Sequence, residues 1–310
     1  NLKKVINQLI EEHGGFIEQN YLLDNLVNIS ATNVHASEEE KVLHKNHLDF
    51  LVSKLLQDEF EKVENSKYFK NYFKFKHRIL DHLEEIAEEL LENIKDFKKI
   101  MATEEIINLT KQTASYKKYE DKLQAPNAVD LSNILKKELF EEDGEFINSN
   151  KVIYSILQAA KRIEQNKFGH WGMNDSREIT PKTINDKIYL VLSNHGKPMH
   201  FKEIAERINE VSFDKKIANA ATVHNELILD KKYVLIGRGL YGLKDWGYKK
   251  GTVADIIIEI LKASAKPLAK DEILEEVLKQ RLVKKATVIL ALMNKDKFRK
   301  IEGGRYALKD

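Results

Sequence analysis

The chain has 310 residues, of which 32% are charged and 8% aromatic, with a formal net charge of +2. This length exceeds that of one small domain, and the composition excludes an intrinsically disordered chain. The absence of cysteine excludes disulfides and cysteine-ligated metal sites, and no apolar run approaches the ~20 residues that cross a bilayer, so we expect a cytoplasmic protein without a membrane segment.

Residues 1–77 predict three helices followed by a hairpin. Apolar residues recur at helical spacing in three segments, residues 2–12, 18–27 and 38–57. Residues 60–76 are rich in aromatic residues on both sides of Asn65-Ser66, which is typical of a β-hairpin. Because a winged helix has this order of elements, residues 1–77 are predicted to form a degenerate winged-helix module.

Residues 78–175 predict a second, distorted module. Helical periodicity marks four segments, residues 78–97, 101–107, 131–140 and 150–166. The periodicity fails over residues 111–130, a polar stretch that contains Pro126 and is predicted to be an insertion or loop.

Residues 176–247 and 248–310 predict two further modules with matching sequences. Thr222–Leu243 aligns without a gap with Thr287–Leu308, and a Thr-x-x-Asp capping pattern precedes the first helix of each module. A repeated unit of helices and a hairpin predicts tandem winged helix-turn-helix modules. The predicted fold class is therefore mainly α with small β-hairpins, an α+β fold.

Charge is divided unevenly along the chain. Residues 1–150 carry 20 Lys and Arg against 29 Asp and Glu, a balance of −9, whereas residues 151–310 carry 31 against 20, a balance of +11. A basic half is typical of a surface that faces nucleic acid or another acidic partner. Ordinary solvated charge in both halves is the alternative interpretation.

The third helix of a winged helix normally lies in the major groove, and its hairpin contacts the DNA backbone. In residues 176–247 the polar candidates for base contacts are Asn219, Thr222, His224 and Asn225. Asn can form a bidentate pair with adenine, and His can donate to a base acceptor. His224 and Asn225 are the first candidates for sequence specificity, because the matching positions in the fourth module are apolar.

Basic residues flank both predicted third helices and their hairpins. They are Lys231, Lys232 and Arg238 in one module, and Arg281, Lys284, Lys285, Lys295, Arg299, Lys300 and Arg305 in the other. Such residues suit phosphate contacts, which supply affinity with little specificity. For any single residue, ordinary solvent-facing charge is the alternative.

No motif predicts catalysis, a metal or a cofactor. Residues 237–242 match G-x-G-x-x-G, but a strand rather than a helix is expected to follow, so the glycines are assigned to a tight hairpin. The closest histidine pairs, His195 with His200 and His44 with His47, lack a clear third ligand. The chain is therefore predicted not to be an enzyme. Two tryptophans beside glycines, Trp171 and Trp246, are candidates for packing between modules or for stacking on bases.

Residues 181–245 resemble the HARE-HTH winged-helix domain, in the segments PKTINDKIYLVLSNHGKPMHFKEIAERIN, TVHNELI and GRGLYGLKDWG. That domain occurs in the delta subunit of bacterial RNA polymerase, in some restriction endonucleases and in eukaryotic chromatin proteins. With the following VLKQRLVKKAT segment, the chain resembles a bacterial sigma-factor-like protein with several winged helices. On this resemblance, the sigma region-four helix-turn-helix would precede Asn1.

Three hypotheses follow for function. The first is a transcription-associated protein that binds double-stranded DNA through tandem winged helices. The second is a protein-interaction module that docks on RNA polymerase without specific DNA binding, which the acidic first half and the apolar third helix of the fourth module favour. The third is the specificity part of a restriction-type nuclease, which requires a catalytic domain that no motif of this chain indicates.

Overall fold

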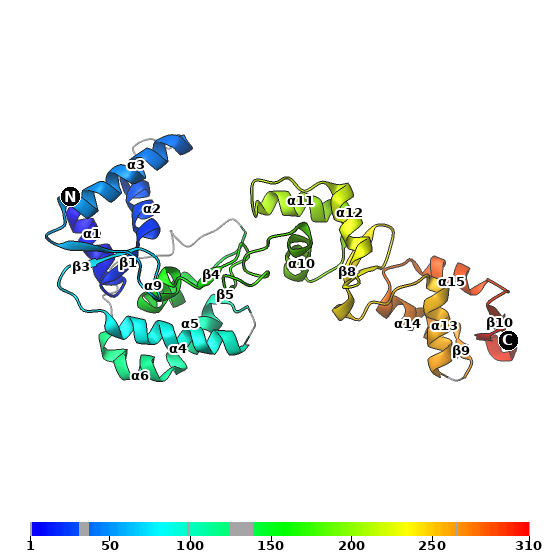
Figure 1. Cartoon of the computed structure of the whole chain (residues 1–310). Coiled ribbons are helices and arrows are strands. Elements are labelled where there is room, and N and C mark those ends of the chain that lie inside the picture. The colour runs from blue at the N-terminus through cyan, green and yellow to red at the C-terminus, as the bar shows by residue number, and fades with distance from the viewer. Residues whose placement is uncertain (1, 31–36, 98–99, 124–138, 265, 310) are drawn as a thin grey trace. The chain divides into compact units, whose positions relative to one another are not determined.

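The computed structural model describes residues 2–30, 37–97, 100–123, 139–264 and 266–309. The chain divides into two units, Asn1–Thr180 and Pro181–Asp310 (Figure 1). Helices dominate the described residues, and their sheets have two or three strands with antiparallel pairing throughout. The predicted fold class, mainly α with small β-hairpins, is confirmed.

The first unit begins with three helices and a three-stranded sheet. Its elements are α1 (Leu2–Glu12), β1 (Phe16–Glu18), α2 (Gln19–Ser30), α3 (Glu38–Phe50), a π-helical segment (Leu51–Leu55), β2 (Phe60–Val63) and β3 (Tyr72–Phe75). The sheet order is β1-β3-β2. α3 starts at its predicted residue because Ser37 and Glu40 form a capping box. The hairpin predicted over residues 60–76 is present, and β1 is an additional strand that the sequence did not predict.

The rest of the first unit is mostly helical. Its described elements are α4 (Asp81–Phe97), α5 (Thr103–Gln112), α6 (Ala114–Tyr119), a 3-10 helix (Glu120–Lys122), α8 (Gly144–Asn148), α9 (Lys151–Ala159), β4 (Ile163–Gln165) and β5 (Trp171–Met173). α6 occupies part of the predicted insertion at 111–130, because Thr113 caps it by accepting from the Tyr116 N–H. The last residues of that insertion, and the predicted helix over 131–140 up to residue 138, lie outside the described residues.

The single helix predicted over residues 150–166 is wrong. α9 ends at Ala159, and β4 and β5 then form a hairpin. The turn between them is stabilised by Asn166, whose Oδ1 accepts from the N–H groups of Phe168 and His170. This local bonding favours a turn where helical periodicity alone predicted a continuing helix.

Residues on both sides of position 77 share one hydrophobic core. Phe16, Phe69 and Tyr72 pack with residues of α4 and α9, among them Leu83 and Ile156. The three aromatic rings lie 5.6–5.9 Å apart between centroids. A buried ion pair adds to this contact, because Lys151 Nζ at the start of α9 lies 3.3 Å from Glu12 Oε2 at the end of α1. We therefore propose that the modules assigned to residues 1–77 and 78–175 fold together.

The second unit contains one order of elements twice. The first set is α10 (Ile184–His195), β6 (Met199–His200), α11 (Phe201–Val211), α12 (Ala220–Leu229), β7 (Tyr233–Leu235) and β8 (Leu240–Leu243), followed by a 3-10 helix (Lys244–Trp246). The second set is α13 (Val253–Ser264), β9 (Leu268–Ala269), α14 (Lys270–Gln280), α15 (Lys285–Leu292), β10 (Phe298–Lys300), a 3-10 helix (Glu302–Gly304) and β11 (Arg305–Leu308). Their sheets have equivalent orders, β6-β8-β7 and β9-β11-β10.

The caps and the register of the second unit follow the sequence repeat. Thr183 and Asp186 form the predicted capping box at the start of α10, and Thr252 and Asp255 exchange equivalent hydrogen bonds before α13. The two hairpins have the same register, with Tyr233 opposite Leu243 and Phe298 opposite Leu308. In the described ranges, each helix is too short or too polar to reach across a membrane.

Candidate nucleic-acid interface

The position of α12 is set by buried residues and by a clamp at its start. Val223 and Leu227 are buried on its inner side. Asn209 of α11 brackets the preceding residue, because its side chain donates to Ala218 O and accepts from Ala218 N–H at 3.1 and 2.7 Å. Asn219 then caps the helix by accepting from the Ala221 N–H at 2.8 Å. One oxygen of this predicted base reader is therefore engaged in holding α12.

The outer face of α12 presents two polar residues and two apolar ones. Thr222 and Asn225 are exposed, as the prediction requires. Ile228 and Leu229 continue the same face and are 57% and 77% exposed. This face therefore offers one amide for base recognition within a partly apolar surface.

His224 lies away from this outer face. It is half-buried, and its ring packs 4.5 Å from the Phe201 ring and 5.8 Å from the Tyr241 ring, measured between centroids. The ring therefore stabilises the contact of α12 with α11 and β8. We leave His224 out of the proposed contact set, although the sequence placed it among the first candidates.

Two of the three predicted cations beside α12 are exposed. Lys231 follows the helix, and Arg238 lies in the turn between β7 and β8. Lys232 is half-buried, and its Nζ lies 3.3 Å from Asp230 Oδ2 and 5.5 Å from the centroid of the Tyr189 ring. The backbone N–H of Lys232, together with its ammonium, lowers the pKa of Asp230. Lys232 therefore holds the start of the hairpin, whereas Lys231 and Arg238 are available for phosphate.

The G-x-G-x-x-G sequence forms a hairpin turn, as predicted. Gly239 has a φ of +70°, and strand β8 begins at the next residue. A Cβ at Gly239 would lie 2.4 Å from His200 Nε2, so both the conformation and the space favour glycine. The segment lacks the following helix whose N-terminus would bind a phosphate.

The corresponding face of α15 is apolar between basic ends. Lys284 and Lys285 are exposed at its start. Leu290 and Met293, the equivalents of Asn225 and Ile228, are 70% and 65% exposed. This helix can contact phosphate at its start, but its face carries no side chain that distinguishes base edges at those two positions.

Arg281 differs from the other predicted phosphate contacts. It is buried, and its guanidinium Nη1 donates to the Leu235 carbonyl oxygen of β7. Burial lowers the pKa of Arg281. Arg281 therefore joins the two element sets of the second unit and is removed from the proposed DNA-contacting set.

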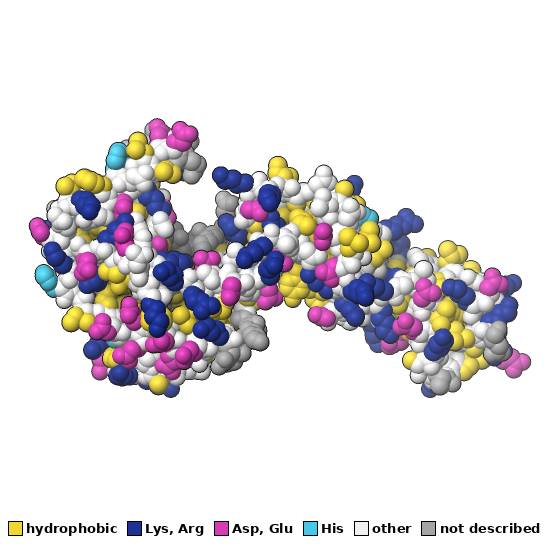
Figure 2. Space-filling view, in the orientation of Figure 1, with side chains coloured by type: hydrophobic (Ala, Val, Ile, Leu, Met, Phe, Trp, Pro, Cys, Tyr) yellow, Lys and Arg dark blue, Asp and Glu magenta, His cyan; other side chains and the backbone are white. Residues whose placement is uncertain are grey.

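The remaining basic residues surround the second hairpin. Lys295, Arg299, Lys300 and Arg305 are exposed. Arg305 also donates from Nη1 to the Pro267 carbonyl oxygen at 3.2 Å. Many Lys and Arg side chains are visible over residues 181–310, whereas Asp and Glu gather over α4 in the first unit (Figure 2).

A family comparison agrees with this geometry. Residues 182–246 match the family HARE-HTH, whose description names an HTH domain of ASXL and restriction endonuclease proteins. Residues 182–246 form a HARE-HTH domain. This is a winged-helix type of DNA-binding domain, and the match covers α10 to the 3-10 helix after β8. No curated protein matches the chain.

The two tryptophans have different environments. Trp171 is buried within the first unit, where its Nε1 donates to Thr103 Oγ1 at 2.8 Å, so it packs rather than stacks on a base. Trp246 closes the HARE-HTH domain and is half-buried, with its ring 6.5 Å from that of Tyr248.

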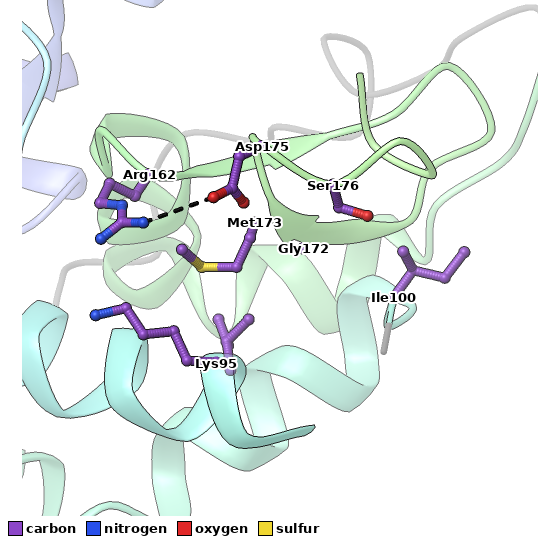
Figure 3. A pocket seen from close by; sticks show the side chains of 8 residues that line it. Lys95, Ile100, Arg162, Gly172, Met173, Asp175 and Ser176 are labelled. Atoms are coloured by element: carbon purple, nitrogen blue, oxygen red, sulfur yellow. Dashed lines mark ion pairs between the residues drawn. The ribbon is translucent and has the colours of Figure 1, made fainter. Parts of the chain in front are cut away.

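A small pocket in the first unit supports no catalytic interpretation. It encloses about 290 Å³ between the end of α4 and β5 (Figure 3). Arg162 and Asp175 point toward each other on one side, with Nη2 and Oδ2 3.8 Å apart. Ser176 lies far from Lys95 in this view, and its Oγ accepts from the Glu178 N–H. Within the described residues, no group of three or more His, Cys, Asp or Glu could hold a metal ion.

Proposed function

We propose that the second unit binds double-stranded DNA and that the HARE-HTH domain makes its base contacts. The observation that carries this proposal is the outward position of Thr222 and Asn225 between Lys231 and Arg238. The Asn225 amide can pair with an adenine edge, while the two cations contact phosphates. Lys284 and Lys285 at the start of α15 supply further phosphate contacts.

Duplex binding by the full chain is expected to depend steeply on salt. With about five phosphate contacts, the slope of log K against log salt should be about −4 to −5. Lys231→Glu combined with Arg238→Glu should make the slope shallower by about two and weaken binding to every sequence. Fluorescence anisotropy with a labelled duplex over a salt series measures both quantities.

Two variants sharpen this experiment. Lys197→Glu changes an exposed lysine in the turn between α10 and β6 and should leave the slope unchanged. Asn225→Ala should keep the slope but reduce discrimination at one base pair by about 1–3 kcal/mol. A flat slope for the unaltered chain would rule out the proposal.

We further propose that the protein acts in transcription, as a sigma-factor-like protein or an RNA polymerase accessory. The support is the resemblance of residues 181–245 and of the VLKQRLVKKAT segment to bacterial transcription proteins. A second candidate function, docking on RNA polymerase without specific DNA binding, is favoured by the apolar part of the HARE-HTH surface. Ile217 and Leu229 are 86% and 77% exposed on either side of the polar residues of α12.

The second candidate predicts that polymerase retention survives nuclease. Core RNA polymerase should be retained by the immobilised chain after the nucleic acid is digested. Ile217→Ser combined with Leu229→Ser should abolish this retention, because it removes two large apolar contacts, and Lys197→Glu serves again as the matched control. Loss of retention on nuclease treatment alone would contradict direct docking.

A further inference from the structure

The second hairpin of the second unit borders an open groove that the sequence did not indicate. The groove encloses about 810 Å³ between the end of α15 and the strands β10 and β11. Its apolar part is formed by Met293, Phe298 and Tyr306. Its charged lining residues are all basic: Lys295, Arg299, Lys300 and Lys309.

This charge pattern is specific to the fourth module. The 65-residue offset of the repeat places Lys295 at the position of Asp230 and Lys300 at the position of Leu235. In the HARE-HTH domain, Asp230 accepts from the Lys232 N–H and pairs with its ammonium. The change from an acidic and an apolar residue to two lysines turns a self-bonded hairpin start into a basic rim.

The apolar part of the groove indicates more than phosphate binding. Met293 is 65% exposed at the end of α15, and a thioether side chain adapts to varied apolar partners. The backbone of a DNA duplex has charge but no large apolar group that could cover it. A single-stranded base would need an open aromatic face, yet Phe298 is only 4% exposed and Tyr306 is half-buried.

We propose that this groove binds an acidic protein segment with a bulky apolar side chain. The apolar side chain inserts against Met293 and Tyr306, and flanking carboxylates pair with Lys295, Lys300 and Lys309. The occupant follows from charge complementarity and from the single apolar seat between cations. This surface is separate from Asn225, Lys231 and Arg238, so its failure would leave the proposed DNA binding unaffected.

The test uses the full chain and labelled probes of about twelve residues or nucleotides. The first probe is a peptide of Asp and Glu with a central Phe and Leu, and the second has Ser at those two positions. The third probe is a single-stranded oligothymidine. Burial of one large apolar side chain should make the first peptide bind at least about tenfold more tightly than the second in fluorescence anisotropy.

Variants assign the binding to the groove. Met293→Asp should weaken the first peptide by about tenfold or more and leave the second nearly unchanged. Lys295→Glu with Lys300→Glu should weaken both peptides, whereas Lys262→Glu, an exposed lysine of α13, should weaken neither. Met293→Ser provides a milder variant should the aspartate lower the melting temperature.

Two results would overturn the proposal. Equal affinities for the two peptides would reduce the groove to a charged surface. Tighter binding of the oligothymidine, with no effect of either Met293 variant, would assign the cations to nucleic acid instead.

Discussion

Lys151→Met is expected to destabilise the first unit by about 3–5 kcal/mol, because it leaves the carboxylate of Glu12 buried without its cation. Both side chains are only 2% exposed, and their charged atoms lie 3.3 Å apart. The pair joins α1 to α9 across 139 positions of the chain. Urea unfolding of the full chain, followed by a signal from Trp171, measures this loss.

A double-mutant cycle separates the pair from its surroundings. Glu12→Leu with Lys151→Met replaces both charges and should cost much less than either single change, so the coupling free energy should exceed about 1 kcal/mol. Lys118→Met provides the control, because its pair with Glu85 is exposed and should leave stability nearly unchanged. Two separate unfolding transitions within the first unit would contradict the proposal that its modules fold together.

His13 is expected to make the first unit sensitive to mild acid. Burial lowers the pKa of His13 to about 4, and the nearby ammonium of Lys151 lowers it further while Glu12 acts in the opposite direction. The ring is fully buried, and its Nδ1 lies 2.6 Å from the Leu9 carbonyl oxygen. A neutral ring that donates from Nδ1 fits this position.

The direction of the pH effect follows from the two pKa values. The unfolded chain binds a proton below pH ~6.5, whereas the folded chain resists protonation down to pH ~4. Stability should therefore fall as the pH drops below ~6.5, by about 2 kcal/mol at pH 5 and about 3 kcal/mol near pH 4. Urea unfolding at pH values from 7 to 5 measures the slope.

The His13→Phe variant should be less stable at pH 7, because it loses the hydrogen bond to Leu9, but should have a flatter profile between pH 7 and 5. His77→Phe changes an exposed histidine and should leave the profile unchanged. If His13→Phe retains the full loss of stability, another group is responsible for the acid sensitivity.

Local features of this fold were predictable from sequence because neighbouring residues determine them. The capping boxes at Thr183 and Ser37 need only a residue three positions away. The register of the second hairpin follows from that of the first, since the repeat has no gap between Thr222 and Leu243. The HARE-HTH domain was recognised because its motifs span these same local elements.

The inner strands and the broken helix were not predictable in the same way. β6 has only two residues, which is too short to show the alternation that marks a strand. After Ala159, helical periodicity gave no sign of a break, and the side-chain bonds of Asn166 decide the turn. Short segments thus take their structure from contacts that periodicity does not register.

The candidate site was predicted in part. Asn225 and Lys231 lie on the surface as expected, but His224 follows the buried Val223, at the edge of the inner face of α12. Only its packing on Phe201 decides that the ring turns inward. Arg281 shows the same limit, because its exposure depends on a carbonyl group 46 positions away. Charge patterns identify cations but not which of them are buried.

The shared core of the first unit has a consequence for how this protein can change by recombination. Phe16, Phe69 and Tyr72 come from the first 77 residues, but they complete the packing of Leu83 and Ile156. A gene in which either segment was exchanged alone would encode a partner with an uncovered aromatic face. The two segments should therefore be inherited together, whereas residues 248–310, with a core built from their own side chains, can be duplicated or replaced as a block.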